Sequence, residues 1–146
     1  MHFITGGSFN GKKRWALNFY QLTFDKEEMK VVRFYDKEDI EDLLEVTKPF
    51  LLLEGIEYWI RHKIMTLEED KIYDYFYTFF KRLKDWENSG DNHQVILIGS
   101  DITKGIVPIK KEDRLWRDVT GRIFQEAVRM ADRVDVVWYG LHDQLK

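Results

Sequence analysis

Short runs of hydrophobic residues recur along the chain and are separated by longer, more polar segments. The runs cover residues 2–5, 29–35, 50–53, 95–98 and 134–139, and most of them are rich in valine, isoleucine, leucine or phenylalanine. Such residues favour strands, and an uninterrupted apolar run is typical of a strand buried on both faces of a parallel sheet. We therefore expect a strand at each of these five places.

Hydrophobic residues at helical spacing fill most of the segments between these runs. The spacing predicts helices over residues 11–22, 67–86 and 111–132, and a further helix that Asp36 caps and that ends at Pro49. The aromatic stripe of the helix over 67–86 indicates core or a subunit interface. This alternation predicts a parallel α/β sheet with right-handed crossovers, one domain over residues 1–146, and a short tail after the last strand.

Composition narrows the class of protein. The chain has 146 residues, 44% of them hydrophobic and 15% aromatic, which is enough for one well-packed core. The net charge of −3 argues against nucleic acid or an anionic membrane as a partner. The absence of cysteine excludes disulfides, thiolate catalysis and cysteine-ligated zinc. No run approaches a membrane span and the chain starts directly in a strand, so we expect a cytoplasmic protein.

The segment between the first strand and the first helix matches the phosphate-binding pattern G-x-x-x-x-G-K-[ST] except at its last position. Its residues are Gly6, Gly7, Ser8, Phe9, Asn10, Gly11, Lys12 and Lys13. The glycines let backbone N–H groups turn toward phosphate oxygens, and Lys12 supplies a positive charge for the outer phosphates. Lys13, however, stands where a serine or threonine hydroxyl binds Mg²⁺. The sequence predicts a nucleotide or polyphosphate site that has lost this metal ligand.

Two acidic residues follow buried strands. Glu54 comes directly after the run 50–53, and Asp101 comes shortly after the run 95–98. Ligands of open α/β sheets bind beyond the carboxyl ends of the strands, so we expect both acids beside the phosphates. Glu54 is the first choice for holding Mg²⁺ or its water shell. The alternative, that each acid only caps the following helix, stays open.

Several segments share a pattern with one family. They are Thr5-Gly6-Gly7-x-x-x-Gly11-Lys12, Leu51-Leu52-Leu53-Glu54-Gly55 with Trp59, Gly105-Ile106-Val107-Pro108, Arg114-x-x-Arg117-Asp118-x-x-Gly121-Arg122-x-x-Gln125, and Ala131-Asp132-x-Val134. In this order and near this spacing the chain resembles the adenosylcobinamide kinase/adenosylcobinamide-phosphate guanylyltransferase family. The resemblance covers nearly the whole chain except one gap, between Lys12 and Glu54.

The resemblance implies a RecA-like P-loop fold, with a mostly parallel sheet in a three-layer α/β/α arrangement, often as a symmetric homotrimer. It implies ATP or GTP with Mg²⁺ as cofactors, and phosphorylation of the aminopropanol hydroxyl of the corrinoid cobinamide. Lys12 would act on the β- and γ-phosphates, and Glu54 and Asp101 on the metal and the attacking hydroxyl. Three arginines, Arg114, Arg117 and Arg122, would bind substrate. Solvated helix charges, with Asp118 and Arg122 paired, explain these arginines equally well.

This family also transfers GMP to the new phosphate through a histidine in the segment after the first helix. Here the path from Lys12 to Glu54 is shorter than in the family, and no histidine occurs between His2 and His62. A phosphoramidate intermediate needs an imidazole nitrogen, so we expect the guanylyltransferase step to be absent by that route.

Further departures fall in the kinase half. Gly55 replaces a cysteine, Arg61-His62 replace a Thr-Asn pair, and Ser100-Asp101 replace Asn-Glu. Two functional classes follow: a slow nucleotide-dependent kinase of cobalamin assembly, or a non-catalytic relative with a nucleotide-binding, interaction or regulatory role.

Overall fold

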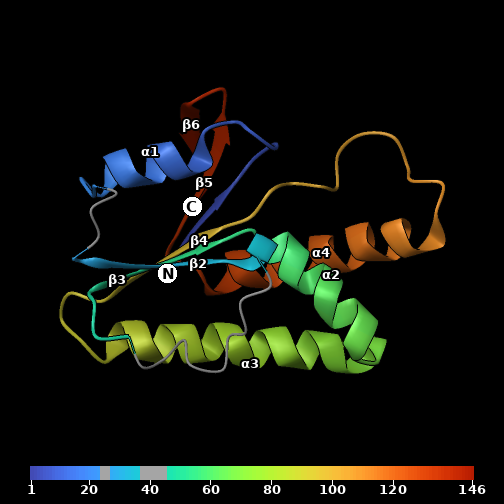
Figure 1. The fold of residues 1–146 in the computed structure, drawn as a ribbon, viewed down its shortest axis with the longest axis horizontal. Coiled ribbons are helices and arrows are strands. Elements are labelled where there is room, and N and C mark those ends of the chain that lie inside the picture. The colour runs from blue at the N-terminus through green and yellow to red at the C-terminus, as the bar shows by residue number, and fades with distance from the viewer. Residues whose placement is uncertain (24–26, 37–45) are drawn as a thin grey trace.

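The computed structural model describes residues 1–23, 27–36 and 46–146 (Figure 1). Strands and helices alternate along most of the chain. In chain order they are β1 (His2–Thr5), α1 (Lys12–Phe19), β2 (Met29–Arg33), the 3₁₀ turn η1 (Phe34–Asp36), β3 (Phe50–Glu54), α2 (Ile56–Thr66), α3 (Glu69–Asn88), β4 (Gln94–Ile98), α4 (Lys111–Met130), β5 (Arg133–Trp138) and β6 (Leu141–Gln144).

The strands form one sheet in the order β2-β3-β4-β1-β5-β6. Every pair is parallel except β5 and β6, which are antiparallel. The strand that leads into the glycine-rich loop, β1, therefore lies inside the sheet between β4 and β5. Because β1, β3 and β4 are parallel neighbours, the segments that follow them emerge at the same edge of the sheet.

Helices cover both faces of the sheet (Figure 1). Helix α1 packs on one face against Ile4, Leu52 and Ile96, whereas α2, α3 and α4 pack on the other face against their strand neighbours. Leu51, for example, points to the face opposite Leu52, because successive side chains of a strand alternate. The apolar runs are thus buried on both faces. The predicted α/β class, with a mostly parallel sheet in three layers, is confirmed.

Some element bounds differ from the predictions. The first helix ends at Phe19 instead of residue 22, and the second strand ends at Arg33, where the chain turns into η1. The predicted short tail is wrong: residues 141–144 pair with β5 as the edge strand β6. Their side chains are exposed, so they carry no hydrophobic pattern that predicts a strand.

Of the helix predicted between Asp36 and Pro49, residues 37–45 lie outside the described residues, whereas Asp36 belongs to η1 and residues 46–49 are not helical. Among the residues that the structure describes, no helix combines the length and the hydropathy of a bilayer span.

Candidate functional site

The glycine-rich loop joins β1 to α1 in a shape that only glycine permits at two positions. Gly6 has φ 136° and Gly11 has φ 86°. A Cβ at Gly6 would lie 2.1 Å from the carbonyl oxygen of Val137 on β5, so a larger residue would displace that strand. The N–H of Gly140 donates to the carbonyl of Asn10 at 2.9 Å, which ties the loop to the turn between β5 and β6.

Lys12 begins α1 and places its ammonium group inside the curve of the loop. Its Nζ donates to the carbonyl oxygens of Gly7 at 2.8 Å and Gly6 at 3.2 Å, and to Oγ of Ser100 at 3.1 Å. The side chain is buried, and this burial lowers the pKa of Lys12, while the charges of two nearby glutamates oppose the shift. All three hydrogen-bonded oxygens are uncharged. A phosphate oxygen would therefore be a stronger acceptor than any of them.

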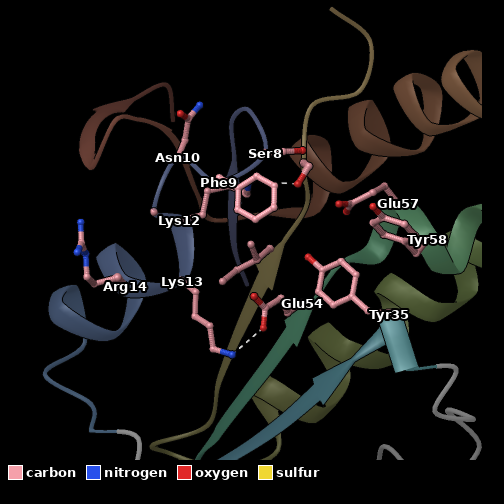
Figure 2. A pocket seen from close by; sticks show the side chains of 13 residues that line it. Ser8, Phe9, Asn10, Lys12, Lys13, Arg14, Tyr35, Glu54, Glu57 and Tyr58 are labelled. Carbon is pink, nitrogen blue, oxygen red and sulfur yellow. Dashed lines mark hydrogen bonds and ion pairs between the residues drawn. The ribbon is translucent and has the colours of Figure 1, made fainter. Parts of the chain in front are cut away.

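A cavity of about 560 Å³ opens beside the loop, within the usual size range of small-molecule sites. Residues 8–14 line it together with residues from β3, α2 and the end of β4. Figure 2 shows the loop on one side of this cavity and the side chains of Tyr35, Glu54, Glu57 and Tyr58 on the other. We call it the loop pocket. The predicted phosphate-binding segment thus borders an open cavity.

Three aromatic rings border the loop pocket. Phe9 has φ 59° and a fully exposed ring. Tyr35 and Tyr58 are half-exposed, and their ring centroids lie 5.0 Å apart. Tyr35 covers Gly55, where a Cβ would lie 2.6 Å from the ring, so Gly55 is required for this packing. Exposed ring faces of this kind are suited to stacking against a flat ligand.

Lys13 points across the pocket to Glu54, as the dashed line in Figure 2 shows. Its Nζ donates to Oε2 of Glu54 at 2.7 Å, and Nε of Arg33 lies 3.8 Å from the same oxygen. Two cations thus converge on the carboxylate that we predicted to hold Mg²⁺. While this pair is intact, the residues do not fit a Mg²⁺ ion. The role of Glu54 in metal binding stays a prediction.

The residues available as metal ligands also do not fit a Mg²⁺ ion. Within residues 1–23, 27–36 and 46–146, no group of three or more histidine, cysteine, aspartate or glutamate residues is placed to hold a metal ion. The alternative helix-capping role of Glu54 also finds no support, because the N-cap of α2 is Gly55 and no side chain in the described part of the chain caps that helix.

Glu57, in the first turn of α2, is a pocket residue that we did not predict. Its side chain is almost completely buried, and in the described structure its Oε2 has no hydrogen-bond partner. Burial raises the pKa of Glu57, whereas hydrogen bonds from its own backbone and from Ser100, and the charge of Lys12, oppose the shift. One sequence signal was available: Glu57 lies between Ile56 and Ile60 on the buried side of the helix. An acid in an apolar stripe indicates a functional group.

Ser100, and not Asp101, lines the loop pocket. Asp101 instead accepts hydrogen bonds from the backbone N–H and the hydroxyl of Thr103, and it pairs with Lys104 at 3.6 Å. The polar group that β4 brings to the pocket is therefore the hydroxyl next to the predicted acid. A catalytic role of Asp101 stays a prediction that this arrangement does not support.

The three predicted substrate arginines lie on α4 and do not line the loop pocket. Arg114 donates to the carbonyl oxygens of Pro108 and Ile109, which fixes the loop before α4. Arg117 donates to Asp118 at 3.4 Å. Arg122 donates to the hydroxyl of Tyr73 at 3.3 Å on α3. Each guanidinium group has a structural partner, and substrate binding by these arginines stays a prediction.

The parallel sheet and the glycine-rich loop between β1 and α1 define the class as an α/β protein of the P-loop type. A family model described as "Cobinamide kinase / cobinamide phosphate guanyltransferase" matches residues 29–145. The chain belongs to this family, as the sequence resemblance predicted, and the family assigns it to cobalamin biosynthesis. Members act on nucleotide and cobinamide substrates. A comparison with curated proteins gives no match.

The family match covers some residues of the loop pocket but not the glycine-rich loop itself. It includes Glu54, Glu57 and Ser100, but it begins after the glycine-rich loop. The loop is therefore identified independently of the match, by its sequence pattern, the backbone geometry of its glycines and its place beside the pocket.

Proposed function

We propose that this protein binds ATP or GTP in the loop pocket and slowly phosphorylates the hydroxyl group of cobinamide. The observation that carries the proposal is the buried Lys12 ammonium, held at the pocket by three uncharged oxygens. A triphosphate would offer it anionic acceptors and would also meet the N-terminus of α1. Lys13 and Arg14 line the same pocket and add positive charge.

Slow transfer follows from the Lys13–Glu54 ion pair. In phosphoryl transfer Mg²⁺ bridges phosphate oxygens and neutralises charge that develops on them. The ammonium group of Lys13 supplies part of that charge, but it does not bridge two oxygens in octahedral geometry. We therefore propose that nucleotide binding here depends little on Mg²⁺.

The guanylyltransferase step is not part of this proposal. All four histidines lie in the described part of the chain, and none of them lines the loop pocket. His2 is buried between Tyr20 and Asp135, and His93 stacks on Trp86. Neither arrangement presents an imidazole nitrogen to a nucleotide in the pocket.

A second candidate function is nucleotide binding without catalysis, in an interaction or regulatory role. The 2.7 Å ion pair between Lys13 and Glu54 favours it, because the acid expected at the metal is held by a residue of the protein itself. The two candidates share the binding step and differ only in whether product forms.

The homo-oligomer that the family resemblance implies also belongs to the proposal. The loop before α4 exposes Ile106 and Ile109 almost fully, and such side chains are suited to contact with another subunit. Light scattering of the purified protein measures the subunit number, and a monomer at all concentrations would contradict this part.

The main experiment incubates the purified chain with ATP or GTP, with and without Mg²⁺ and cobinamide. Thermal shift reports binding, and mass spectrometry reports phosphorylated cobinamide. We expect a nucleotide-induced shift that Lys12→Met abolishes and that Lys81→Met, on the exposed side of α3, leaves unchanged. Binding with product supports the kinase, binding without product supports the second candidate, and no binding contradicts both.

A further inference from the structure

The carboxylate of Glu57 is buried at a position where packing alone does not explain its burial. It follows Ile56 in the first turn of α2, and its side chain is 1% exposed. Buried carboxylate oxygens are normally hydrogen-bonded, because desolvation without a partner destabilises the folded chain. Among the described residues Oε2 of Glu57 has no partner, yet the side chain borders the loop pocket. A donor that arrives with a ligand would satisfy this oxygen.

The neighbours of Glu57 are those expected around a triphosphate. Nζ of Lys12 donates to Oγ of Ser100 at 3.1 Å, and both Ser100 and the charge of Lys12 oppose the rise in the pKa of Glu57. Glu57, Ser100 and Lys12 all line the loop pocket. A phosphate bound by Lys12 would therefore share the loop pocket with the Glu57 side chain. The attacking group of an acceptor would also have to lie there.

We propose that Glu57 is the general base of the phosphoryl transfer, with Oε2 accepting the proton of the acceptor's hydroxyl group. This inference rests on the kinase function proposed above. The acceptor oxygen forms a bond to the γ-phosphorus while the bond from that phosphorus to the β,γ-bridging oxygen breaks. The nucleoside diphosphate leaves with that electron pair, and the proton of the hydroxyl passes to Glu57. No oxidant, reductant or further reactant is needed.

The other two acids near the sheet edge are less suited to this role. Glu54 is held by Lys13 at 2.7 Å, and Asp101 is held by Thr103 and lies outside the pocket lining. Glu57 alone of the three combines a pocket position with an oxygen that has no partner among the described residues. Its burial also raises its pKa, and a carboxylate with a raised pKa is a stronger base.

The first test compares Glu57→Gln with the wild type in nucleotide binding and in cobinamide phosphorylation. Glutamine keeps the shape and removes the base, so we expect an unchanged nucleotide-induced thermal shift and KM for nucleotide, with kcat reduced about 100-fold or more. Glu112→Gln is the matched control, since Glu112 is an exposed acid in the first turn of α4. We expect it to keep the wild-type kcat.

The second test uses chemical rescue, which a structural role of Glu57 would not produce. Glu57→Ala leaves space for a small carboxylate, and we expect added formate to restore phosphorylation in proportion to its concentration, while chloride does not. Loss in Glu57→Gln together with formate rescue supports the base. Activity retained in Glu57→Gln, or loss without rescue, overturns it while the kinase stands. A wild type that binds nucleotide but forms no product overturns the kinase and the base together.

Discussion

At its amino end β1 places His2 in a buried cluster with Tyr20 and Asp135, and at its carboxyl end it leads into the loop that holds Lys12 beside Glu57. Both ends bury charged groups. In the first cluster Nδ1 of His2 lies 2.8 Å from the Tyr20 hydroxyl, and Nε2 lies 2.7 Å from Asp135. Arg133 contacts both oxygens of Asp135, at 2.6 and 3.1 Å.

In the second cluster, around Lys12 and Glu57, the buried polar atoms are not all hydrogen-bonded within the described structure. Oε2 of Glu57 has no hydrogen-bond partner in the described structure, and neither has Oγ1 of Thr5, the last residue of β1. Burial of charged groups alone therefore does not mark a functional site. A buried cluster whose polar atoms are all paired stabilises the fold, whereas an unpaired atom beside a cavity indicates where a ligand binds.

Removal of Asp135 is expected to have the largest effect. Asp135→Ala leaves His2 and Arg133 without the carboxylate that both contact, so we expect the free energy of unfolding to fall by about 3 to 5 kcal/mol. Urea unfolding measures it. Asp143→Ala is the control. Asp143 lies on β6 opposite Val136, the residue next to Asp135, and its side chain is exposed. A loss under about 1 kcal/mol for Asp135→Ala would mean that the cluster is not structural.

Lys13→Ser changes the loop pocket without disturbing the core. We expect nucleotide affinity to become Mg²⁺-dependent and to rise about tenfold with the metal, which corresponds to about 1.4 kcal/mol, because serine supplies the missing hydroxyl and frees Glu54. Phosphoryl transfer should rise as well. Calorimetric titration with and without Mg²⁺ measures the change. If affinity and transfer both stay unchanged, the Lys13–Glu54 pair does not limit Mg²⁺ binding or phosphoryl transfer.

Glu57→Gln is expected to change the free energy of unfolding in the opposite direction to Asp135→Ala. The wild-type carboxylate is buried, and one of its oxygens has no hydrogen-bond partner within residues 1–23, 27–36 and 46–146, so we expect the amide to raise the free energy of unfolding by about 1 kcal/mol. The functional site would then carry a stability cost that the His2 cluster does not. Urea unfolding at pH 7 tests this, and a clear decrease in stability would show that the Glu57 charge is satisfied in the folded protein.

The smallest expected effect concerns pH. Burial lowers the pKa of His2 below 6.5, although the contact with Asp135 opposes the shift. Below pH 6.5 the unfolded chain takes up a proton that folded His2 does not, so this group's effect is to reduce stability as the pH falls. The reduction ends once the pH is below the folded pKa. We expect the melting temperature of wild type to drop relative to His2→Gln between pH 8 and 5, and a constant difference would contradict the neutral, buried imidazole.

The contribution of Glu57 to stability is expected to change with pH in the opposite direction. Its pKa is raised above 4.5 in the folded protein, so the folded state binds the proton first as the pH falls. The stabilising effect of Glu57→Gln should therefore grow as the pH rises from 4.5 through the folded pKa. The two variants together distinguish the two ends of β1 by the sign of their pH dependence.

The layers of the fold and the glycine-rich loop follow from the amino-acid sequence alone. Hydrophobic runs such as residues 50–53 and 95–98 required strands buried on both faces, and the segment from Gly6 to Lys12 predicted the loop at the end of the first strand. These features depend on residues close together in the chain. Hydrophobic patterning and backbone geometry are local properties, so a sequence displays them directly.

The groups that meet at the pocket are brought together by the arrangement of the strands in the folded protein. Strand order brings Glu54 to Lys13 across 41 positions, and it brings Ser100 to Lys12 across 88. Neighbouring residues can also face different surroundings, which is why Ser100 borders the pocket and Asp101 does not. Side chains separated by many residues are placed by the packing of whole elements, and no local pattern specifies that a buried oxygen of Glu57 has no hydrogen-bond partner among the described residues.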